Sequence, residues 1–203
     1  MTAGGPAARA RDHDDHEAIK SLKYAYLRCL DLKRWDEFEQ LLVPEVTGRY
    51  GGLDFESRDE LVDYMRTQLT DDITTFHQVH HPEITVDGDR ARGRWYLHDK
   101  VFVPAFDLAL EGAAFYDDVL VRTAEGWRFS QVSYHRTFEA TWTMSAVPGW
   151  KLRRGRRTTR SEAPASDRSP HPPQPSRSQT AQRTESAKKS ATWLTPWMSS
   201  RAS

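Results

Sequence analysis

The stretch TTFHQVHHPEITVDGDRARGRWYLHDKVFV, residues 74–103, decides the fold. Polar and apolar residues alternate along both of its halves, with the period of two that is typical of a strand buried on one face. Asp87-Gly88-Asp89 lies between the halves and is a hairpin signal, because glycine adopts the backbone conformations that tight turns need. The stretch therefore predicts two long antiparallel strands over residues 74–87 and 90–103.

The alternation continues downstream of this hairpin. It predicts two further strands over residues 108–122 and 127–143, joined by a turn at Ala124-Glu125-Gly126. A meander of four long strands twists and curls, so the predicted sheet has a concave face.

Upstream of residue 73 the apolar residues recur with a period of 3.6, which is typical of helices. A first helix is predicted over residues 15–31, with Asp14 as its N-cap and Glu17 three residues later. A second, short helix begins near Trp35, continues through Leu41 and Leu42, and ends before a proline.

A short strand and a third helix complete the first half of the chain. The strand is predicted over residues 46–50, and the helix begins at the capping box Ser57-Arg58-Asp59-Glu60 and continues to Leu69. Three helices followed by a meander make an α+β fold. Helices that lie on the concave face of the sheet would enclose a pocket.

Charge divides the chain into two parts that the overall balance conceals. The whole chain carries 29 basic and 29 acidic side chains, but residues 153–203 carry 11 Lys and Arg against 3 Asp and Glu. That segment is rich in Ser, Thr and Pro, and it has too few long apolar residues to offset the entropy of ordering. We predict a flexible N-terminus at residues 1–13, one domain at residues 14–152 and a disordered basic tail at residues 153–203.

The run Arg153-Arg154-Gly155-Arg156-Arg157 leaves three explanations of the tail open. It is compatible with contact with nucleic acid or an anionic membrane, with a solvated segment that has no partner, and with a shifted reading frame. The composition favours the solvated segment, so we predict no specific nucleic-acid partner and no membrane partner.

Cysteine usage and hydropathy restrict the compartment. Cys29 is the only cysteine, which excludes an intrachain disulfide, and with no nearby base it is predicted in the core. The N-terminus lacks the apolar core of a secretory signal, and no stretch approaches the roughly 18 apolar residues of a membrane span. These observations predict a soluble, cytoplasmic protein.

Three histidines in five residues suggest a metal site at first sight. Side chains alternate along a strand, so His77 and His81 share one face and His80 lies on the other. His77 and His81 are then about 13 Å apart, from a rise of about 3.3 Å per residue, and cannot share one ion. We therefore predict no metal site.

His77 is instead a candidate general base. It shares a strand face with Val79, which predicts a half-buried ring, and a carboxylate partner would hold that ring in one tautomer and raise its basicity. Asp31 is a candidate partner, because a carboxylate at the C-terminal end of a helix is unfavourable for the helix dipole. The alternatives are a core histidine bonded to a neighbour and an aspartate exposed to solvent.

Asp99 is a second candidate acid. Alternation places it on one strand face with Trp95, Leu97 and Val101, where partial desolvation would favour its neutral form and make it a hydrogen-bond donor. The alternative is a bulge or register slip that turns Asp99 to solvent. Two tyrosines, at positions 26 and 50, either bring phenols to the pocket or pack in the core.

At these residues the chain resembles the SnoaL-like branch of the NTF2-like superfamily, over residues 14–150. Four runs carry the resemblance: Leu30-Asp31-Leu32-Lys33-Arg34-Trp35-Asp36, Thr75-Phe76-His77, His81-Pro82-Glu83-Ile84-Thr85-Val86-Asp87-Gly88-Asp89 and Glu125-Gly126-Trp127-Arg128-Phe129. The resemblance implies a cone-shaped antiparallel sheet wrapped around three N-terminal helices. The superfamily holds dehydratases, isomerases, cyclases, epoxide hydrolases and binding modules, so the resemblance implies the fold more strongly than the reaction.

Within this branch the pattern is similar to the lyases related to scytalone dehydratase, hexachlorocyclohexane dehydrochlorinase and bile-acid 7α-dehydratase. Asp31 and His77 match an Asp at the end of the first helix and a His on the first long strand of those lyases. Tyr26 and Asp99 match a tyrosine and a strand acid of the bile-acid enzyme, and Tyr50 matches a pocket tyrosine of scytalone dehydratase. The second histidine and the asparagine of scytalone dehydratase have no match, which disfavours a scytalone-type substrate.

The resemblance implies a cofactor-independent lyase, such as a dehydratase, or an isomerase that acts on a polycyclic or aromatic, ketone-bearing small molecule. His77 would remove a proton α to the carbonyl, Asp31 would orient His77, and Tyr26 and Asp99 would donate hydrogen bonds to the enolate or the leaving hydroxyl. The predicted substrate-binding residues are Tyr50, Trp95, Leu97, Phe115 and Tyr116.

Two rival functions involve no chemistry in this chain. One is a binding module for a small apolar ligand, and the other is the small structural subunit of a ring-hydroxylating oxygenase. Alternation places Arg92, Arg94, Tyr96 and His98 on the outer face of the sheet. Homodimers through the sheet are usual in the resembled family, so the resemblance implies a homodimer.

Overall fold

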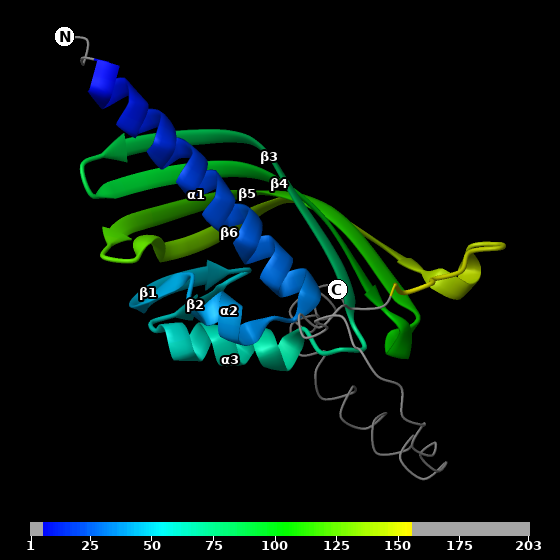
Figure 1. Ribbon diagram of the computed structural model, residues 1–203. Helices are drawn as coiled ribbons and strands as arrows, with labels where there is room; N and C mark the ends of the chain where they lie inside the picture. The colour runs from blue at the N-terminus through cyan, green and yellow to red at the C-terminus, as the bar shows by residue number, and fades with distance from the viewer. Residues whose placement is uncertain (1–5, 156–203) are drawn as a thin grey trace, which may run out of the picture.

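The computed structural model describes residues 6–155, which form one curved sheet with helices on its concave side. In chain order the elements are α1 (Pro6–Leu32), α2 (Trp35–Glu39), β1 (Leu42–Tyr50), β2 (Leu53–Phe55), α3 (Arg58–Gln68), β3 (Thr74–Asp87), β4 (Arg90–Val103), η1 (Pro104–Phe106), β5 (Leu108–Thr123), β6 (Gly126–Thr143) and η2 (Met144–Ala146). Helix α1 runs diagonally across the sheet, and α2 and α3 lie beside β1 and β2 (Figure 1). The predictions for the tail beyond residue 155 lie outside the described residues.

The six strands form an unclosed sheet in the order β2-β1-β6-β5-β4-β3. Strand β1 runs parallel to β6, and every other neighbouring pair is antiparallel. The predicted α+β fold, with a curved sheet around N-terminal helices, is confirmed. The meander β3–β6 supplies the wall on which the site is built.

The long strands occur where alternation predicted them. β3 and β4 coincide with the predicted ranges, and β5 and β6 each extend one residue further at one end, to Thr123 and from Gly126. Gly88 in the first hairpin has φ of 59°, a backbone conformation that favours glycine. The hairpin turn therefore fixes the register of the first two long strands.

Helix α1 begins at Pro6, nine residues before the predicted start, so the predicted start of the helix was wrong. The acid at position 14 lies inside the helix and is not its N-cap. Residues 7–11 consist of Ala and Arg, which have high helix propensity, and proline suits the first turn of a helix. The cap signal was overridden by these strong helix formers.

The segment after α2 differs from the prediction as well. Residues 41 and 42 were predicted as helical, but β1 begins at Leu42. The β1–β6 ladder is interrupted between Leu42 and Thr47, and Pro44, which cannot donate to a ladder, lies in that interval. The short strand β2 was not predicted, because three residues are too few for alternation to be visible. The predicted cap of α3 is confirmed: Ser57 Oγ accepts from the amide of Glu60 at 3.3 Å.

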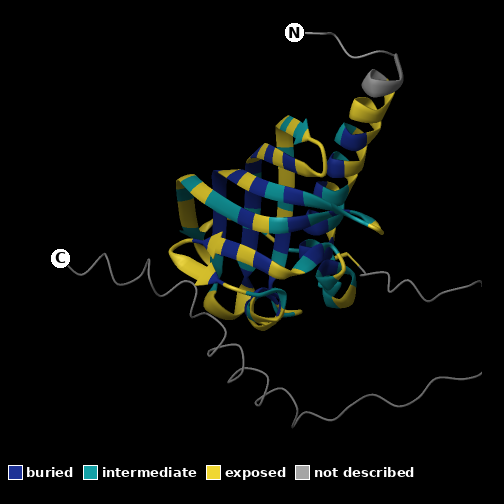
Figure 2. Ribbon diagram, turned by 90° about the vertical axis from the view of Figure 1, so that its left-hand side faces the viewer, coloured by how far each residue is buried: buried dark blue, intermediate teal, exposed yellow. Residues whose placement is uncertain are grey.

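Burial alternates along the strands, as the bands of colour in Figure 2 show. On β4 the residues Trp95, Leu97 and Asp99 are buried, whereas Arg92 and Arg94 are exposed. The predicted inner and outer faces of this strand are therefore confirmed. The inner face packs against α1 and forms the main core.

Ion pairs attach α1 to the sheet at two points before its last turn. Near the start of the helix, Asp15 accepts hydrogen bonds from both Nη atoms of Arg122, at 2.8 and 2.7 Å, and from Trp127 Nε1 at 3.1 Å. Further along, Lys23 Nζ lies 2.8 Å from Asp118 Oδ2, and both side chains are fully buried. These contacts fix the position of α1, so that its last turn reaches β3.

Candidate functional site

A cavity of about 290 Å³ lies on the inner face of the sheet, next to the end of α1 and one side of α3. Its lining is mostly apolar, with several ionisable groups. The lining residues are Leu30, Tyr50, Gly51, Leu53, Tyr64, Met65, Gln68, Leu69, Thr75, His77, Leu97, Asp99, Val101, Tyr116, Tyr134, Arg136 and Glu139. A largely apolar pocket with a few convergent polar groups is typical of a small-molecule site.

Asp31 and His77 meet at the edge of this cavity. His77 Nδ1 lies 2.7 Å from Asp31 Oδ1, and the His77 amide donates to Asp31 Oδ2 at 3.1 Å. Thr75 Oγ1 donates to Asp31 Oδ1 at 2.8 Å, and Lys33 Nζ donates to Thr75 Oγ1 at 3.0 Å. The side chains of His77 and Asp31 are 11% and 22% exposed. The carboxylate is held by three donors, so its orientation is fixed.

This geometry assigns the tautomer of His77. A carboxylate accepts hydrogen bonds, so Nδ1 carries the proton that bonds to Asp31, and Nε2 is left as the basic nitrogen of the neutral ring. His77 lines the cavity, whereas Asp31 is not among the lining residues and contacts His77 from the side away from the cavity. The arrangement is that of a general base with an orienting carboxylate.

The end of α1 explains how Asp31 is placed there. Lys33 follows the helix with φ of 57°, and the amide of Arg34 donates to the carbonyl of Cys29 at 2.9 Å. Such a left-handed residue ends a helix sharply and satisfies its last carbonyls. Asp31 therefore lies on the last turn, facing the start of β3.

Asp99 lies in the cavity wall as predicted, but its partner was not predicted. Arg136 Nη1 and Nη2 donate to Asp99 Oδ1 and Oδ2, at 2.5 and 2.8 Å. Both oxygens are acceptors in this bidentate pair, so Asp99 does not supply the hydrogen-bond donor that we expected from it. Arg136 is the donor here, and burial of Asp99 is compensated by the guanidinium.

The two predicted tyrosines occupy different places. Tyr50 lines the cavity, whereas Tyr26 is fully buried behind it and its hydroxyl is hydrogen bonded to the Tyr50 hydroxyl. The ring of Tyr26 packs against Phe38 and Phe129. Burial raises the pKa of both phenols. Tyr26 therefore reaches the cavity only through Tyr50.

The predicted substrate-binding residues divide in the same way. Leu97 and Tyr116 line the cavity, but Trp95 is buried in the core beyond it. Phe115 is 41% exposed on the outer face, with its ring centroid 5.0 Å from that of Tyr96, so its assignment to the pocket was wrong. Adjacent strand residues point to opposite faces, and Tyr116 takes the inward position.

Strand β6 supplies the residues that the sequence reasoning missed. Tyr134, Arg136 and Glu139 line the cavity, and Gln68 contributes from the end of α3. Alternation would have found Tyr134 and Arg136 together. Glu139 breaks that alternation because a bulge precedes it.

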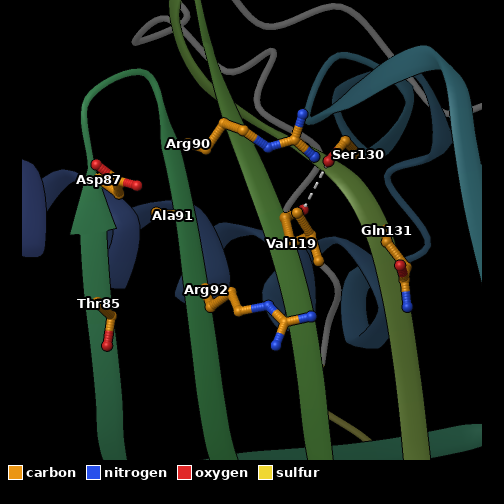
Figure 3. A pocket seen from close by; sticks show the side chains of 8 residues that line it. All are labelled: Thr85, Asp87, Arg90, Ala91, Arg92, Val119, Ser130 and Gln131. Carbon is orange, nitrogen blue, oxygen red and sulfur yellow. Dashed lines mark hydrogen bonds between the residues drawn. The ribbon is translucent and has the colours of Figure 1, made fainter.

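A second hollow, of about 580 Å³, lies on the outer face of the sheet. Figure 3 shows Arg90 and Arg92 extending across β5 on either side of Val119, and Ser130 Oγ donates to the Val119 carbonyl at 3.2 Å. The ionisable residues that line this hollow are all exposed. A hollow with solvated groups provides no desolvated acid or base, so the inner cavity is the candidate site.

Within residues 6–155, no group of three or more His, Cys, Asp and Glu side chains is arranged to hold a metal ion. No helix in this range is both long and apolar enough to cross a membrane.

Comparison with known proteins agrees with the fold. The sequence model described as "SnoaL-like domain" matches residues 11–133. An uncharacterised protein of Mycobacterium tuberculosis is 28% identical over 119 residues, which cover 56% of this chain and 80% of that protein.

Solved structures with an NTF2-like fold superpose on much of the chain. A protein from Kribbella flavida has a TM-score of 0.60 at 23% identity, covering 64% of this chain and 95% of its own. A hexachlorocyclohexane dehydrochlorinase has a TM-score of 0.61 at 14% identity, covering 70% of this chain and 95% of its own. At these identities the superpositions show the fold alone.

Proposed function

The chain belongs to the SnoaL-like domain family, and from this premise and the geometry of its inner cavity we propose that it is a cofactor-independent lyase or isomerase. Its substrate is an aromatic or polycyclic small molecule with a ketone. The single observation that carries the proposal is the contact of 2.7 Å between His77 Nδ1 and Asp31 Oδ1 at the edge of an apolar cavity.

The first step is removal of a proton α to the ketone by His77 Nε2. Asp31 holds the ring in the tautomer that leaves Nε2 free, and its negative charge stabilises the imidazolium that forms. The apolar lining excludes water and strengthens each polar contact. A positioned base of this kind contributes about 10²–10⁴-fold to the rate.

The charge that develops on the ketone oxygen needs donors. Tyr50 and Arg136 line the same cavity as His77, and both carry N–H or O–H groups. Preorganised donors of this kind stabilise an enolate in a site from which water is excluded. Tyr26 acts through its hydrogen bond to the Tyr50 hydroxyl, as a positioning residue.

Two lines of reasoning support an enzyme over a binding module. An apolar ligand needs only apolar walls, yet this cavity holds an oriented acid–base pair and a second pair, Asp99 and Arg136. Burying such pairs gains little net stability over apolar residues of similar size, so a site for an apolar ligand alone gives no reason for them. The dehydrochlorinase and this chain share the fold, which is compatible with elimination chemistry.

Exchange of the α protons of 1-indanone for deuterium in D₂O tests the proposal. We expect the protein to accelerate exchange, and His77→Ala to remove the acceleration, a loss of about 10²–10⁴-fold. Asp31→Asn is expected to lose about 10²-fold while it retains binding of 1-indanone. His80→Ala, on the outer face of the same strand, is the matched control.

A binding module would give a different result. It would bind 1-indanone without accelerating exchange, and His77→Ala would leave both the affinity and the exchange rate within a few-fold. That outcome would remove the proposed chemistry and leave the fold.

We also propose the predicted homodimer, because the outer face of the sheet exposes large aromatic side chains. Tyr96, Phe115 and Phe138 are large side chains that are 37%, 41% and 53% exposed on it. Exposed aromatic groups of this kind are enriched in protein interfaces. Sedimentation of the wild type beside Phe115→Ser would test this, because a weakened dimer is expected only if this face is the interface.

A further inference from the structure

A second carboxyl group faces the cavity, and the mechanism above does not use it. Glu139 lines the cavity from β6, with its side chain 19% exposed. Its Oε2 lies 3.5 Å from Arg136 Nε, a loose contact by comparison with the bidentate pair of Asp99. The group is therefore inside the site but weakly held.

The strand departs from regular alternation to place Glu139 there. Tyr134 and Arg136 face inward, so an unbroken strand would turn residue 139 outward. The register shifts between Ala113↔Phe138 and Ala114↔Arg136, which inserts Thr137 as an extra residue. A bulge of this kind re-aims the side chains that follow it, and bulges are frequent beside active sites.

The register places Glu139 opposite the base. His77 pairs with Asp99, Asp99 pairs with Gly112, and Gly112 pairs with Glu139, so one row crosses four strands. Neighbouring strands are about 4.8 Å apart, so the backbones at the two ends of the row are about 14 Å apart. His77 and Glu139 thus lie at opposite ends of one row of residues that lines the cavity.

Glycine in the middle of this row makes room for the side chain of Arg136. A Cβ at Gly112 would lie 2.6 Å from Arg136 Nη1, so the guanidinium occupies the place of a side chain. Arg136 lies between Asp99 and Glu139 and bonds tightly to the first of them.

Two carboxyl groups thus share one guanidinium. Asp99 takes both Nη atoms, and the like charge of a second carboxylate nearby is unfavourable. Burial raises the pKa of Glu139, Arg136 opposes this, and the charge of Asp99 raises it further. His77 and Tyr134 are the other titratable groups that line this part of the cavity with them. Of the two carboxyl groups, Glu139 is the one without a bidentate bond to the guanidinium, and its pKa is raised.

We propose that Glu139 is the proton donor to the leaving group, and that the reaction is the elimination of water from a β-hydroxy ketone. This inference rests on the proposed function. The α proton passes to His77 Nε2, and the electrons of that C–H bond form the C=C bond. The C–O bond breaks, and the hydroxyl takes the proton of Glu139 and leaves as water. Solvent then carries the proton of His77 back to Glu139.

Two probes with different leaving groups test the assignment. 3-Hydroxy-1-indanone and 3-chloro-1-indanone both give 1-indenone, but only hydroxide needs a proton in order to leave. Glu139→Gln is expected to lose at least about 10²-fold on the hydroxy probe and to stay within about three-fold on the chloro probe. The chloro probe also reports that the variant is folded. Glu111→Gln, a carboxylate of the outer face that is paired with His98, is the matched control.

The outcomes separate this inference from the proposed function. Equal losses on both probes, or no loss on either, would overturn the role of Glu139 while the exchange of 1-indanone protons still reports on His77. If His77→Ala keeps the wild-type rate on the chloro probe, the proposed function fails, whatever Glu139 does. A ¹³C titration of the Glu139 carboxyl decides its protonation without a substrate: an ordinary glutamate titration would contradict the donor role.

Discussion

Two of the acid–base contacts that α1 makes with the sheet lie about two turns apart, and their surroundings differ completely. Lys23 and Asp118 are fully buried, and Lys23 Nζ lies 3.2 Å from the centroid of the Tyr116 ring. Asp31 and His77 are joined by a contact of similar length, 2.7 Å, but lie beside a cavity. Similar chemistry therefore serves packing in the first case and leaves a basic nitrogen available to a ligand in the second.

The pKa values of the buried pair are shifted because both side chains are removed from water. Burial raises the pKa of Asp118 to about 6 and lowers that of Lys23 to about 8, and each charge opposes the shift of the other. A pair this deeply buried gains little net stability over an apolar replacement, although the loss of one partner is costly. The pair is expected to behave as a unit.

The largest effect is expected from breaking that unit. Asp118→Asn leaves the Lys23 ammonium buried without its counter-charge, and we expect a loss of about 3–5 kcal/mol in the free energy of unfolding. The double variant Lys23→Met/Asp118→Leu is expected to recover most of that loss, because no charge stays buried. Urea denaturation of the wild type and the two variants measures this, and a double variant that is no more stable than Asp118→Asn would contradict the description of the pair.

Gly112→Ala tests the ion pair of the cavity, Asp99–Arg136, in the same way. The new Cβ would lie 2.6 Å from Arg136 Nη1 and 3.0 Å from the Phe138 carbonyl oxygen. We expect a loss of about 1–3 kcal/mol in stability, with Arg136 displaced from Asp99. The elimination rate should fall by more than the fraction of the variant that is unfolded can explain. A variant that keeps its wild-type rate would show that the Asp99–Arg136 geometry does not matter to the reaction.

The pH dependence of the free energy of unfolding should show how much the contact between Asp15 and Arg122, near the start of α1, stabilises the fold. Hydrogen bonds from Arg122 hold the pKa of Asp15 below its usual 3.8. The unfolded chain then binds this proton more readily than the folded one, so the stabilisation is present above pH 3.8 and is lost as the pH falls below it.

Asp15→Asn should therefore cost about 1–2 kcal/mol at pH 7 and little at pH 2. Unfolding curves of the variant and the wild type at both pH values measure the difference. A cost that is the same at the two pH values would show that packing, and not charge, is the source of the stabilisation.

The smallest effect is expected from Tyr26→Phe. The change removes a hydroxyl that is bonded to Tyr50 in the core, and we expect a loss of about 0.5–1.5 kcal/mol in stability and less than about ten-fold in rate. Tyr50→Phe, which changes the cavity wall itself, should cost more in rate and serves as the comparison. A rate loss for Tyr26→Phe as large as that for His77→Ala would mean that Tyr26 meets the substrate directly.

The sequence predicted the fold well because alternation is a strong signal over long strands. Ranges 74–87 and 90–103 were predicted to the residue, whereas the three-residue β2 was too short to detect. The start of α1 was misplaced because an acid inside a helix has the same local spacing as a cap.

The site was predicted in part, and the reasons are physical. Asp31 was proposed as the partner of His77 from its place at the end of a helix and from a resemblance, since no local pattern shows that residues 46 positions apart meet. Phe115 was misassigned although alternation with Tyr116 argued against it. Glu139 was missed because a bulge turns it into the inward row of β6, and bulges leave no clear signature in a single sequence. Arg136 precedes the bulge and shares the inward face with Tyr134 by alternation, which was not followed along β6.

One measurement tests the contrast between the two pairs most directly: the deuterium exchange rate of the 1-indanone α protons in His77→Ala beside Lys23→Met/Asp118→Leu. We expect His77→Ala to lose about 10²–10⁴-fold and keep its stability, and the double variant to exchange within a few-fold of the wild type. Exchange that survives in His77→Ala but disappears in a folded Lys23→Met/Asp118→Leu would contradict the account, because the chemistry would then depend on the buried pair.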